Sequence, residues 1–189
     1  KLDGFERIRL SSVEPDLLTS DIIQLVANHP KLMPHFHIPL QSGCDQVLKM
    51  MGRRYDIKLF ADRVSTIRAL IPHACIAADL IVGFPTETRE HFEQTLGFIE
   101  KTDISYVHVF TYSERRNTRA GKLPSQLPVE ERKKRSHQLH ELSARKKAAF
   151  LNANRGLKTK VLWEKEESQG MMYGFTENYI RVKTPFDAA

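Results

Sequence analysis

Apolar residues recur at two different spacings along residues 1–112, and the spacing changes repeatedly. Short runs rich in aliphatic and aromatic residues predict four strands, at 7–12, 36–41, 75–85 and 105–112. The third run is almost wholly apolar, which is typical of a parallel strand that is covered on both faces. Because helical patterns separate these strands, the sequence indicates an α/β fold whose strands pair in parallel through right-handed crossovers.

The segments between these strands carry apolar residues at helical spacing. We predict helices over about 17–26, 45–51 and 58–70, and a fourth that starts at Thr86–Thr88. Asp16 is placed to cap the first of them, because a short polar side chain at that position accepts a backbone N–H bond.

Each predicted strand ends in polar residues or glycine. These residues are Ser11, Ser12 and Glu14, then Gln41, Ser42 and Gly43, then Gly83, Thr86 and Glu87, and finally Tyr112, Ser113, Arg115 and Arg116. In parallel α/β folds, ligands bind at the edge where the carboxyl ends of the strands meet. We therefore expect the strand ends to form one ligand site. The alternative is that polar residues follow strands simply because loops are exposed to water.

Some polar residues have two readings. Asp79 lies inside an apolar strand, so its carboxylate needs a partner. If it faces the interior of the fold, away from the helices, we expect a cationic or hydroxyl neighbour. If it faces the helices, we expect it to bond backbone groups on that side. His37 is interpreted as a hydrogen-bonded histidine of its strand rather than as a ligand. Glu87 is either part of the site or a favourable charge in the first turn of a helix.

The chain changes character after the fourth strand. Residues 117–127 predict a loop, and 129–154 predict a long basic helix. Short segments at 157–164, 170–175 and 179–183 predict strands with interleaved basic and aromatic residues. Such residues could stack bases and contact phosphates, or the aromatic rings could form the core of a small β domain. Because three strands rarely close a β domain, we expect this one to be truncated.

This pattern divides the chain into an α/β part at 1–128, a basic linking helix at 129–155 and a truncated β domain at 156–189. The net charge of +6 and the pI near 9.4 are compatible with a polyanionic partner. The candidate RNA-binding residues on the helix are Lys133, Lys134, Lys146 and Lys147. The alternative for these lysines is an ordinary solvated helix face.

The composition excludes several classes of protein. Cys44 and Cys75 are far apart, so the chain contains no thiol motif for zinc or an iron–sulfur cluster, and we predict no metal ligands in it. No apolar run approaches the roughly 20 residues of a membrane-spanning helix, and no secretory signal begins the chain. The cytoplasm is the expected location.

Three long motifs resemble the signature of one enzyme family. They are His37-Ile38-Pro39-Leu40-Gln41-Ser42-Gly43 with Leu48, Met51 and Arg53-Arg54-Tyr55; the run from Asp79 to Thr88; and His108-Val109-Phe110-Thr111-Tyr112-Ser113-Glu114-Arg115. In this order over about 7–120, they resemble the radical-SAM methylthiotransferases. The third motif is most similar to the branch that acts on threonylcarbamoyladenosine in tRNA. Residues 157–183 resemble the opening of that family's RNA-binding TRAM domain.

The resemblance implies a fold, a reaction and cofactors. The fold would be the C-terminal part, about four βα units, of a partial (β/α)6 TIM-like radical-SAM barrel, followed by a basic helix and a truncated TRAM-like β domain. The full-length enzyme would transfer a methylthio group to C2 of a modified adenosine at tRNA position 37. It would use S-adenosylmethionine and two [4Fe–4S] clusters, which supply the radical chemistry.

The chain differs from this family in what it lacks. Neither the N-terminal domain with three cysteines nor the CxxxCxxC loop that holds the radical-generating cluster is present. We therefore expect an inactive fragment that binds no cofactor and that self-associates through uncovered barrel surface. Asn117 stands where a glycine is usual, and Cys44 stands where serine is common.

The resemblance assigns no catalytic residue to this chain, but it implies cofactor contacts. These contacts are Ser11, Ser12, Glu14, Gln41, Ser42, Gly83, Tyr112 and Arg115. The residues after the first strand would bond the ribose or amino group of S-adenosylmethionine, and those after the second would bind its methionyl part. Gly83 would let the backbone approach the adenine, and Arg115 would meet the cofactor carboxylate or an RNA phosphate.

Two other functions stay open on the sequence. A non-catalytic RNA-binding module would use the basic helix and the β domain, with the α/β part as a scaffold. A phosphate-binding barrel enzyme would need a glycine-rich phosphate loop near its last strands, and the sequence shows none. The salt dependence of tRNA binding would distinguish an RNA module from an ordinary basic surface.

Overall fold

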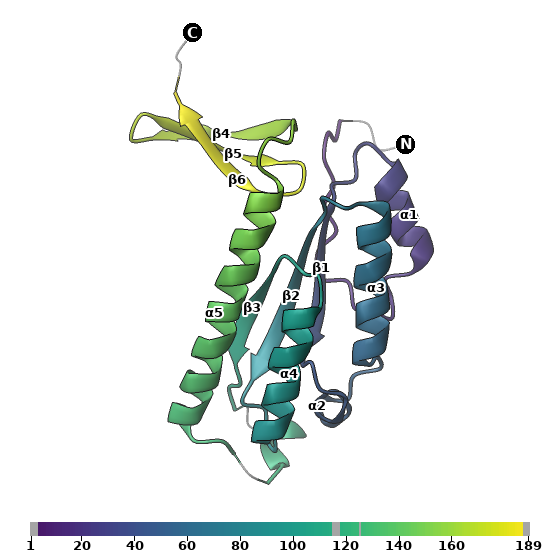
Figure 1. The fold of residues 1–189 in the computed structure, drawn as a ribbon, viewed down its shortest axis with the longest axis vertical. Helices are drawn as coiled ribbons and strands as arrows, with labels where there is room; N and C mark the ends of the chain where they lie inside the picture. The colour runs from purple at the N-terminus through teal and green to yellow at the C-terminus, as the bar shows by residue number, and fades with distance from the viewer. Residues whose placement is uncertain (1–3, 115–117, 125, 187–189) are drawn as a thin grey trace.

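The structure is a computed structural model that describes residues 4–114, 118–124 and 126–186 (Figure 1). Its elements, in chain order, are α1 (Ser20–Asn28), β1 (His35–Gln41), α2 (Asp45–Met51), α3 (Ile57–Leu70), β2 (Cys75–Val82), α4 (Arg89–Lys101), β3 (Tyr106–Thr111), η1 (Ala120–Lys122), α5 (Val129–Ala153), β4 (Val161–Ser168), β5 (Met171–Thr176) and β6 (Arg181–Pro185). The α/β elements therefore come first, and the antiparallel strands follow the long helix.

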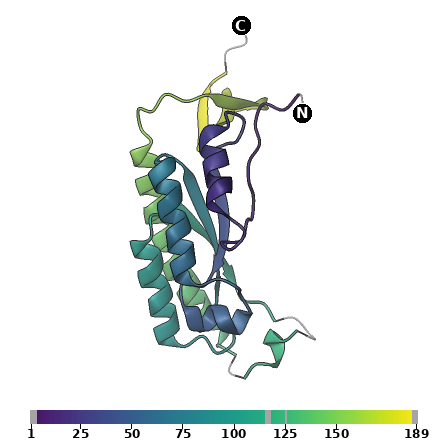
Figure 2. The same cartoon turned by 90° about the vertical axis from the view of Figure 1, so that its right-hand side faces the viewer.

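Strands β1, β2 and β3 form a parallel sheet in that spatial order, which confirms the predicted α/β fold. Helices α3 and α4 cover one face of the sheet, α1 packs beside α3, and α5 runs along β3 (Figure 1 and Figure 2). Because the strands are parallel, their carboxyl ends lie together at one end of the molecule, the lower end in Figure 1.

The hydrophobic core lies between the sheet and its helices, because successive side chains of a strand point to opposite faces. In β1, Phe36 and Ile38 are buried on the helix side. Other elements contribute Ile76, Ala78, Leu80, Val82, Phe60, Val64, Ile67, Phe92, Ile99, Leu139 and Leu142 to the same core. The opposite face of the sheet carries His37, Asp79 and His108 at neighbouring positions, and we call it the polar face.

The predicted strand at 7–12 is wrong. In its place, Ile8 makes a single bridge to Leu32, and the N–H of Val13 donates to the carbonyl of His37 at 3.1 Å. The segment lies beside the outer edge of β1, but Pro39 offers no N–H there, so a hydrogen-bond ladder cannot continue. Ser12 also has a φ of 53°, which interrupts an extended conformation.

The prediction that Asp16 caps the first helix is also wrong. Residues 14–18 form a turn instead, in which the N–H groups of Leu17 and Leu18 both donate to the carbonyl of Glu14 at 3.0 Å. Helix α1 begins after this turn, and the side chain of Thr19 accepts the N–H of Ile22 as its cap.

The long basic helix predicted after residue 128 is confirmed as α5. Its buried side consists of Arg132, Arg135, Leu139 and Leu142. Ser143 Oγ accepts the N–H of Val107 at 3.0 Å and donates to its carbonyl at 2.8 Å, so the helix closes the outer edge of β3. Neither α5 nor any other helix in the described part of the chain is long and apolar enough to cross a membrane.

Strands β4, β5 and β6 form an antiparallel sheet, and each begins later than predicted. Gln169 and Gly170 join β4 to β5 with positive φ angles of 55° and 72°, which suits a tight hairpin. The side-chain amide of Asn178 donates to the carbonyl of His73 and to Asn154 Oδ1, both at 2.8 Å. These bonds hold the antiparallel sheet at the amino-terminal end of β2, opposite the carboxyl ends of the strands (Figure 1).

Candidate functional site

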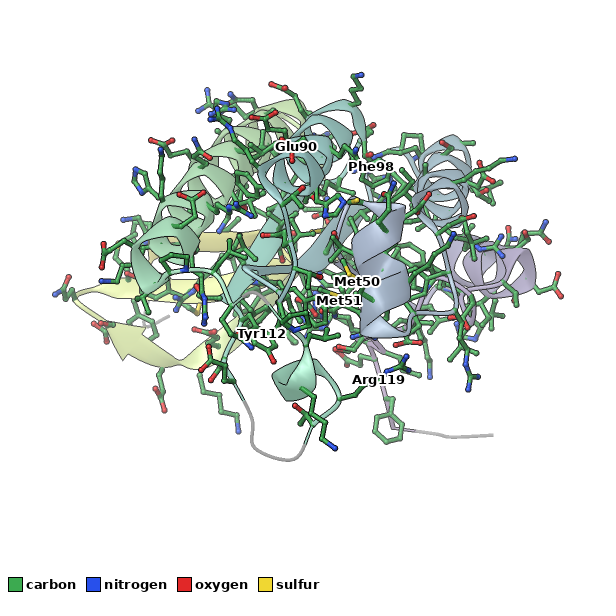
Figure 3. All side chains as sticks on the ribbon, turned by 90° about the horizontal axis from the view of Figure 1, so that it is seen from below. Met50, Met51, Glu90, Phe98, Tyr112 and Arg119 are labelled. Atoms are coloured by element: carbon green, nitrogen blue, oxygen red, sulfur yellow. The ribbon has the colours of Figure 1, made fainter. Side chains whose placement is uncertain are left out.

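Helix α2 and the short helix η1 lie at the end of the sheet where the carboxyl ends of β1, β2 and β3 meet (Figure 1). A small apolar cluster forms at this end from Cys44, Val47, Met50, Met51, Phe84, Tyr112, Ala120 and Leu123. Figure 3 views this end and shows that Met50, Met51 and Tyr112 lie close together. We call the strand ends at 41–43, 83–87 and 112–114, together with this cluster, the rim.

Two residues of the rim have a strained backbone conformation. Gln41 and Thr86 have φ angles of 69° and 72°, although neither residue is glycine. A non-glycine residue in the left-handed region costs roughly 1–2 kcal/mol. Such conformations persist where the surrounding structure holds them, and they are common at ligand sites. The surrounding structure therefore holds these two residues, at strand ends predicted to bind a ligand, in the left-handed backbone conformation.

Glu87 anchors the turn that follows β2. Its buried carboxylate accepts the N–H of Gly83 at 2.9 Å and pairs with Nη1 of Arg135 at 2.8 Å. The same Arg135 atom donates to the carbonyls of Glu87 and Thr88. Burial raises the pKa of the Glu87 carboxyl, whereas the Gly83 N–H and the guanidinium favour its charged form. Glu87 is therefore more than a surface charge in a first turn: it holds Gly83 to α5.

A second arginine of α5 holds the other side of the same turn. Arg132 donates to the carbonyls of Leu127 and Tyr112 at 2.8 and 3.2 Å, and to the carboxylate of Glu114 at 2.7 Å. Its side chain packs directly against Gly83, which has a φ of 78°. Sequence analysis missed both arginines, although they precede Leu139 and Leu142 at spacings of three and four residues, typical of a buried helix face.

Among the residues after the first predicted strand, Glu14 lies close to the rim, whereas Ser12 lies beside His37 on the polar face. Glu14 pairs with Nη1 of Arg53 at 2.7 Å, which places it next to the end of α2. A cavity of about 300 Å³ opens there, lined by Glu14, Asp16, Leu17, Met51, Gly52, Arg53 and Arg54. Ser12 Oγ lies 3.4 Å from His37 Nδ1, and Ser11 is exposed.

Ser42 faces away from the rim. Its buried hydroxyl accepts the N–H of Cys44 at 3.2 Å and lies 3.3 Å from Thr95 Oγ1 of α4. Thr95 also accepts the N–H of Gly43, so this part of the turn is used to attach β1 to α4. Gln41 lies at the end of β1 and is itself largely buried. Unlike that of Ser42, the side chain of Gln41 makes no hydrogen bond within the described part of the chain.

Tyr112 is part of the rim, and Arg115 lies outside the described residues. The ring of Tyr112 packs edge-on against Phe84 with 5.5 Å between centroids. The geometry therefore brings Gln41, Gly83 and Tyr112 to one end of the sheet, with Glu14 close by.

The four lysines of α5 have different environments. Lys133 and Lys134 are exposed, and Lys133 pairs with Glu130 at 3.0 Å. Lys147 is exposed and lies over the ring of Tyr106, with 5.6 Å from Nζ to the centroid. Lys146 instead donates to the carbonyls of Glu100 and Thr102 at the end of α4, and burial lowers its pKa. It attaches α5 to α4 and is poorly placed for RNA.

The polar face contains a group of residues that sequence analysis considered only singly. Asp79 Oδ1 lies 2.8 Å from His37 Nε2, so its partner is an imidazole, where a cationic or hydroxyl neighbour was expected. The rings of His37 and His108 pack edge-on at 5.5 Å, and burial lowers the pKa of His108. The three residues come from three strands, so no local spacing in the sequence could have connected them.

Comparison with known proteins gives a family match. Residues 2–99 match the model of the Radical SAM superfamily, which covers just over half of the chain. The chain is 34% identical to the threonylcarbamoyladenosine tRNA methylthiotransferase MtaB of Bacillus subtilis over 186 residues, which cover 96% of this chain and 41% of that protein. It is 38% identical to the MtaB of Aquifex aeolicus over 183 residues, covering 97% of this chain and 43% of that protein.

A second group of relatives carries a different name. The tRNA-2-methylthio-N(6)-dimethylallyladenosine synthase of Clostridium botulinum (strain Okra) is 39% identical over 153 residues, covering 79% of this chain and 34% of that protein. Among solved structures, coproporphyrinogen III oxidase HemN from Escherichia coli, a radical SAM enzyme, aligns with a TM-score of 0.53 at 20% identity, over 78% of this chain and 32% of that one. This likeness concerns the fold alone. The chain spans about two fifths of the length of the curated MtaB relatives.

Proposed function

This chain belongs to the radical SAM superfamily, and we propose that it is part of a cytoplasmic enzyme that methylthiolates a modified adenosine at position 37 of tRNA. The observation that supports this proposal best is that Gln41, Gly83 and Tyr112 meet at one rim of a parallel sheet in a chain similar to tRNA methylthiotransferases over nearly its whole length. We further propose the threonylcarbamoyladenosine branch as the substrate class, because both of its representatives above cover at least 96% of this chain.

In this proposal the rim binds S-adenosylmethionine. Gln41 and Tyr112 contribute polar groups, the buried Gly83 lets the chain turn beneath Arg132, and the Glu14–Arg53 pair borders the adjacent cavity. Arg115 is proposed as a contact to the cofactor carboxylate or to an RNA phosphate. When bound beside a reduced iron–sulfur cluster, S-adenosylmethionine supplies the radical chemistry. The described residues orient the cofactor and shield it from water.

The cysteines of this chain do not fit an iron–sulfur cluster. Cys44 is buried at the start of α2, where its Sγ donates to Gln46 Oε1 at 2.9 Å. Cys75 begins β2 at the opposite end of the sheet, and burial raises its pKa to about 11. A cluster is held by several thiolates, and these two thiols lie at opposite ends of the sheet. We propose that this chain is part of a longer protein that holds two clusters. The ligands of both clusters would lie in the other parts of that protein.

The test compares the chain with that longer protein after anaerobic reconstitution with iron and sulfide. With S-adenosylmethionine, a reductant and a sulfur donor, the longer protein should produce the 2-methylthio nucleoside in tRNA, measured by mass spectrometry of digested nucleosides. Residues 1–189 alone should show neither the absorbance of a [4Fe–4S] cluster nor product. A longer protein that carries its cluster but leaves tRNA unmodified would overturn the proposed function.

We also propose that residues 1–189 alone self-associate, because Phe110 is 54% exposed on the polar face. Light scattering at high micromolar concentration measures this directly. A single monomeric species would contradict self-association without affecting the proposed reaction.

We propose that tRNA binds through α5 and through the antiparallel sheet. In this proposal the chain consists of a barrel part at 1–128, a linking helix at 129–155 and a truncated TRAM-like domain at 156–189 that contains the antiparallel sheet. The exposed lysines Lys133 and Lys134 support this, as do the aromatic rings beside arginines in the antiparallel sheet. Arg181 lies over the ring of Tyr173 at 4.7 Å. Bases stack on such rings, and phosphates bind such cations.

Reversing the charge of both lysines, Lys133→Glu with Lys134→Glu, should weaken tRNA binding and reduce the slope of log affinity against log salt by about 1.5, because each lost phosphate contact removes about 0.7–0.9. Fluorescence anisotropy with labelled tRNA at several salt concentrations measures both effects. Lys58→Glu with Lys101→Glu, which reverses exposed lysines of α3 and α4, is the charge-matched control and should change affinity much less. Equal losses in the two variants would show that only net charge matters.

A non-catalytic RNA-binding module remains the second candidate. One observation favours it: the antiparallel sheet is attached at the amino-terminal end of β2, away from the rim. If a longer protein that carries its clusters leaves tRNA unmodified, yet loses tRNA binding when Lys133 and Lys134 are reversed in charge, the rim is a scaffold and this reading holds.

A further inference from the structure

Three side chains that are able to bind a metal ion converge on the polar face from three adjacent strands. His37 comes from β1, Asp79 from β2 and His108 from β3. One candidate ligand atom from each, an imidazole nitrogen or a carboxylate oxygen, lies within 4.8 Å of the other two. Two imidazoles and one carboxylate are a ligand set that zinc and other first-row divalent metals accept.

We propose that His37, Asp79 and His108 form a binding site for one divalent transition-metal ion of the zinc class, separate from the rim. The site lies partway along the strands, since Asp79 is directly opposite His108 in the β2–β3 register and opposite Pro39, two residues along β1 from His37. It does not depend on the proposed reaction at tRNA.

The backbone supports this site because all its ligands stand on paired strands. The parallel ladders fix the positions of the three Cα atoms, so only side-chain rotations are needed to close the site. Ligands at 2.0–2.2 Å from a tetrahedral ion are about 3.4 Å apart. The distance of 2.8 Å between His37 Nε2 and Asp79 Oδ1 must therefore open slightly, and His108 must turn inward by at most about 1.4 Å.

Neighbouring groups orient two of the ligands. Ser12 Oγ lies 3.4 Å from His37 Nδ1, where it can accept the proton that this nitrogen carries when Nε2 binds a metal. The ring of Tyr106 packs edge-on against that of His108 at 5.2 Å. The side chains of His37 and Asp79 are 20% and 17% exposed and His108 is exposed, so an ion reaches them from solvent.

The competing interpretation is a plain hydrogen bond between His37 and Asp79 that satisfies a carboxylate in an apolar strand. His108 distinguishes the two. It takes no part in that bond, so a structural pair has no need of it, whereas a metal site loses one of its three ligands without it. Lys147 lies over the ring of Tyr106, and its positive charge repels a cation bound nearby. The negative charge of Asp79 is therefore needed to offset this repulsion.

The experiment titrates chelator-treated residues 1–189 with Co2+ and follows the visible absorption that nitrogen and oxygen ligands give to a four- or five-coordinate ion. We expect one Co2+ per chain and its displacement by one equivalent of Zn2+. His108→Ala should weaken binding by about 100-fold or more, because losing an outer-shell partner alone costs 10–100-fold. Asp79→Asn should have a similar effect.

Two controls keep the result interpretable. His137→Ala removes an exposed histidine of α5 and should leave Co2+ affinity unchanged. His108 is itself exposed, so circular dichroism of His108→Ala should match that of the unaltered chain. Absence of the visible absorption, or equal Co2+ affinity in the unaltered chain and in His108→Ala, would overturn the proposed site. Neither outcome bears on the tRNA reaction, because S-adenosylmethionine and tRNA are not involved.

Discussion

Arg135→Ala is expected to lower the free energy of unfolding by about 3–5 kcal/mol, because it leaves the buried Glu87 carboxylate without its cation. The side chains of the pair are only 6% and 2% exposed, so water cannot replace the lost partner. The variant also deprives the carbonyls of Glu87 and Thr88 of a donor. Urea denaturation followed by circular dichroism measures the change.

Lys134→Ala, which removes the exposed neighbour of Arg135, is the matched control and should stay within about 0.5 kcal/mol of the unaltered chain. A loss below about 1 kcal/mol for Arg135→Ala would contradict an essential ion pair. Combining Arg135→Met with Glu87→Gln should cost less than the sum of the single changes, because no isolated charge is then left in the interior.

The pH dependence of Arg135→Ala gives an independent check. Burial raises the pKa of Glu87 in the folded state, and removing the guanidinium takes away a group that opposes this shift. The folded variant then binds more protons than its unfolded form around that pKa, so its free energy of unfolding should rise as the pH falls from 7 toward 5, relative to the unaltered chain. A parallel pH dependence of the two proteins would show that Glu87 is not left charged and buried.

Gly83→Ala is expected to lower the free energy of unfolding by about 2–5 kcal/mol, from a left-handed backbone term of about 1–2 and an overpacking term of about 1–3. The residue has a φ of 78°, and an added Cβ would lie 2.6 Å from Cγ of Arg132. Arg132 cannot simply move aside, since it bonds the carbonyls of Leu127 and Tyr112. Chemical denaturation measures the loss.

Gly97→Ala provides the control, because its Cβ would meet no atom within 4 Å in α4. Alanine is the better helix former, so this change should be neutral or stabilise the chain by up to about 1 kcal/mol. Adding Arg132→Ala to Gly83→Ala should relieve the clash, giving a coupling energy of at least about 1 kcal/mol. Simple additivity of the two changes would show that Arg132 does not restrict Gly83.

Much of the α/β fold follows from local pattern. The alternation in β1 and the continuous apolar run of β2 identify those strands, and helical spacing identifies α2, α3 and α5 with nearly correct bounds. The failure at 7–12 has a specific cause: the segment has the composition of a strand, but its neighbour carries Pro39 where a donor is needed. Strand propensity says nothing about the partner that a strand requires.

The candidate site was predicted less completely. Gln41, Gly83 and Tyr112 reach the rim because parallel strands place their carboxyl ends together, which the element order implies. Ser42 and Lys146 share the residue types of ligand contacts, yet their polar atoms bond Cys44 and the end of α4. Residue type and position along a strand or helix do not reveal the direction of a side chain once a neighbouring element offers it a partner.

Periodicity and motif order were enough to identify the fold class, the long basic helix and the family, because each depends on residues close together in the chain. The Glu87–Arg135 pair, the contact of Arg132 with Gly83 and the grouping of His37, Asp79 and His108 join residues 29 to 71 positions apart. They exist because strand register and helix packing bring these side chains together. Burial then makes their charges and hydrogen bonds far stronger than they would be in water, so such pairs emerge from the folded arrangement and not from any stretch of sequence.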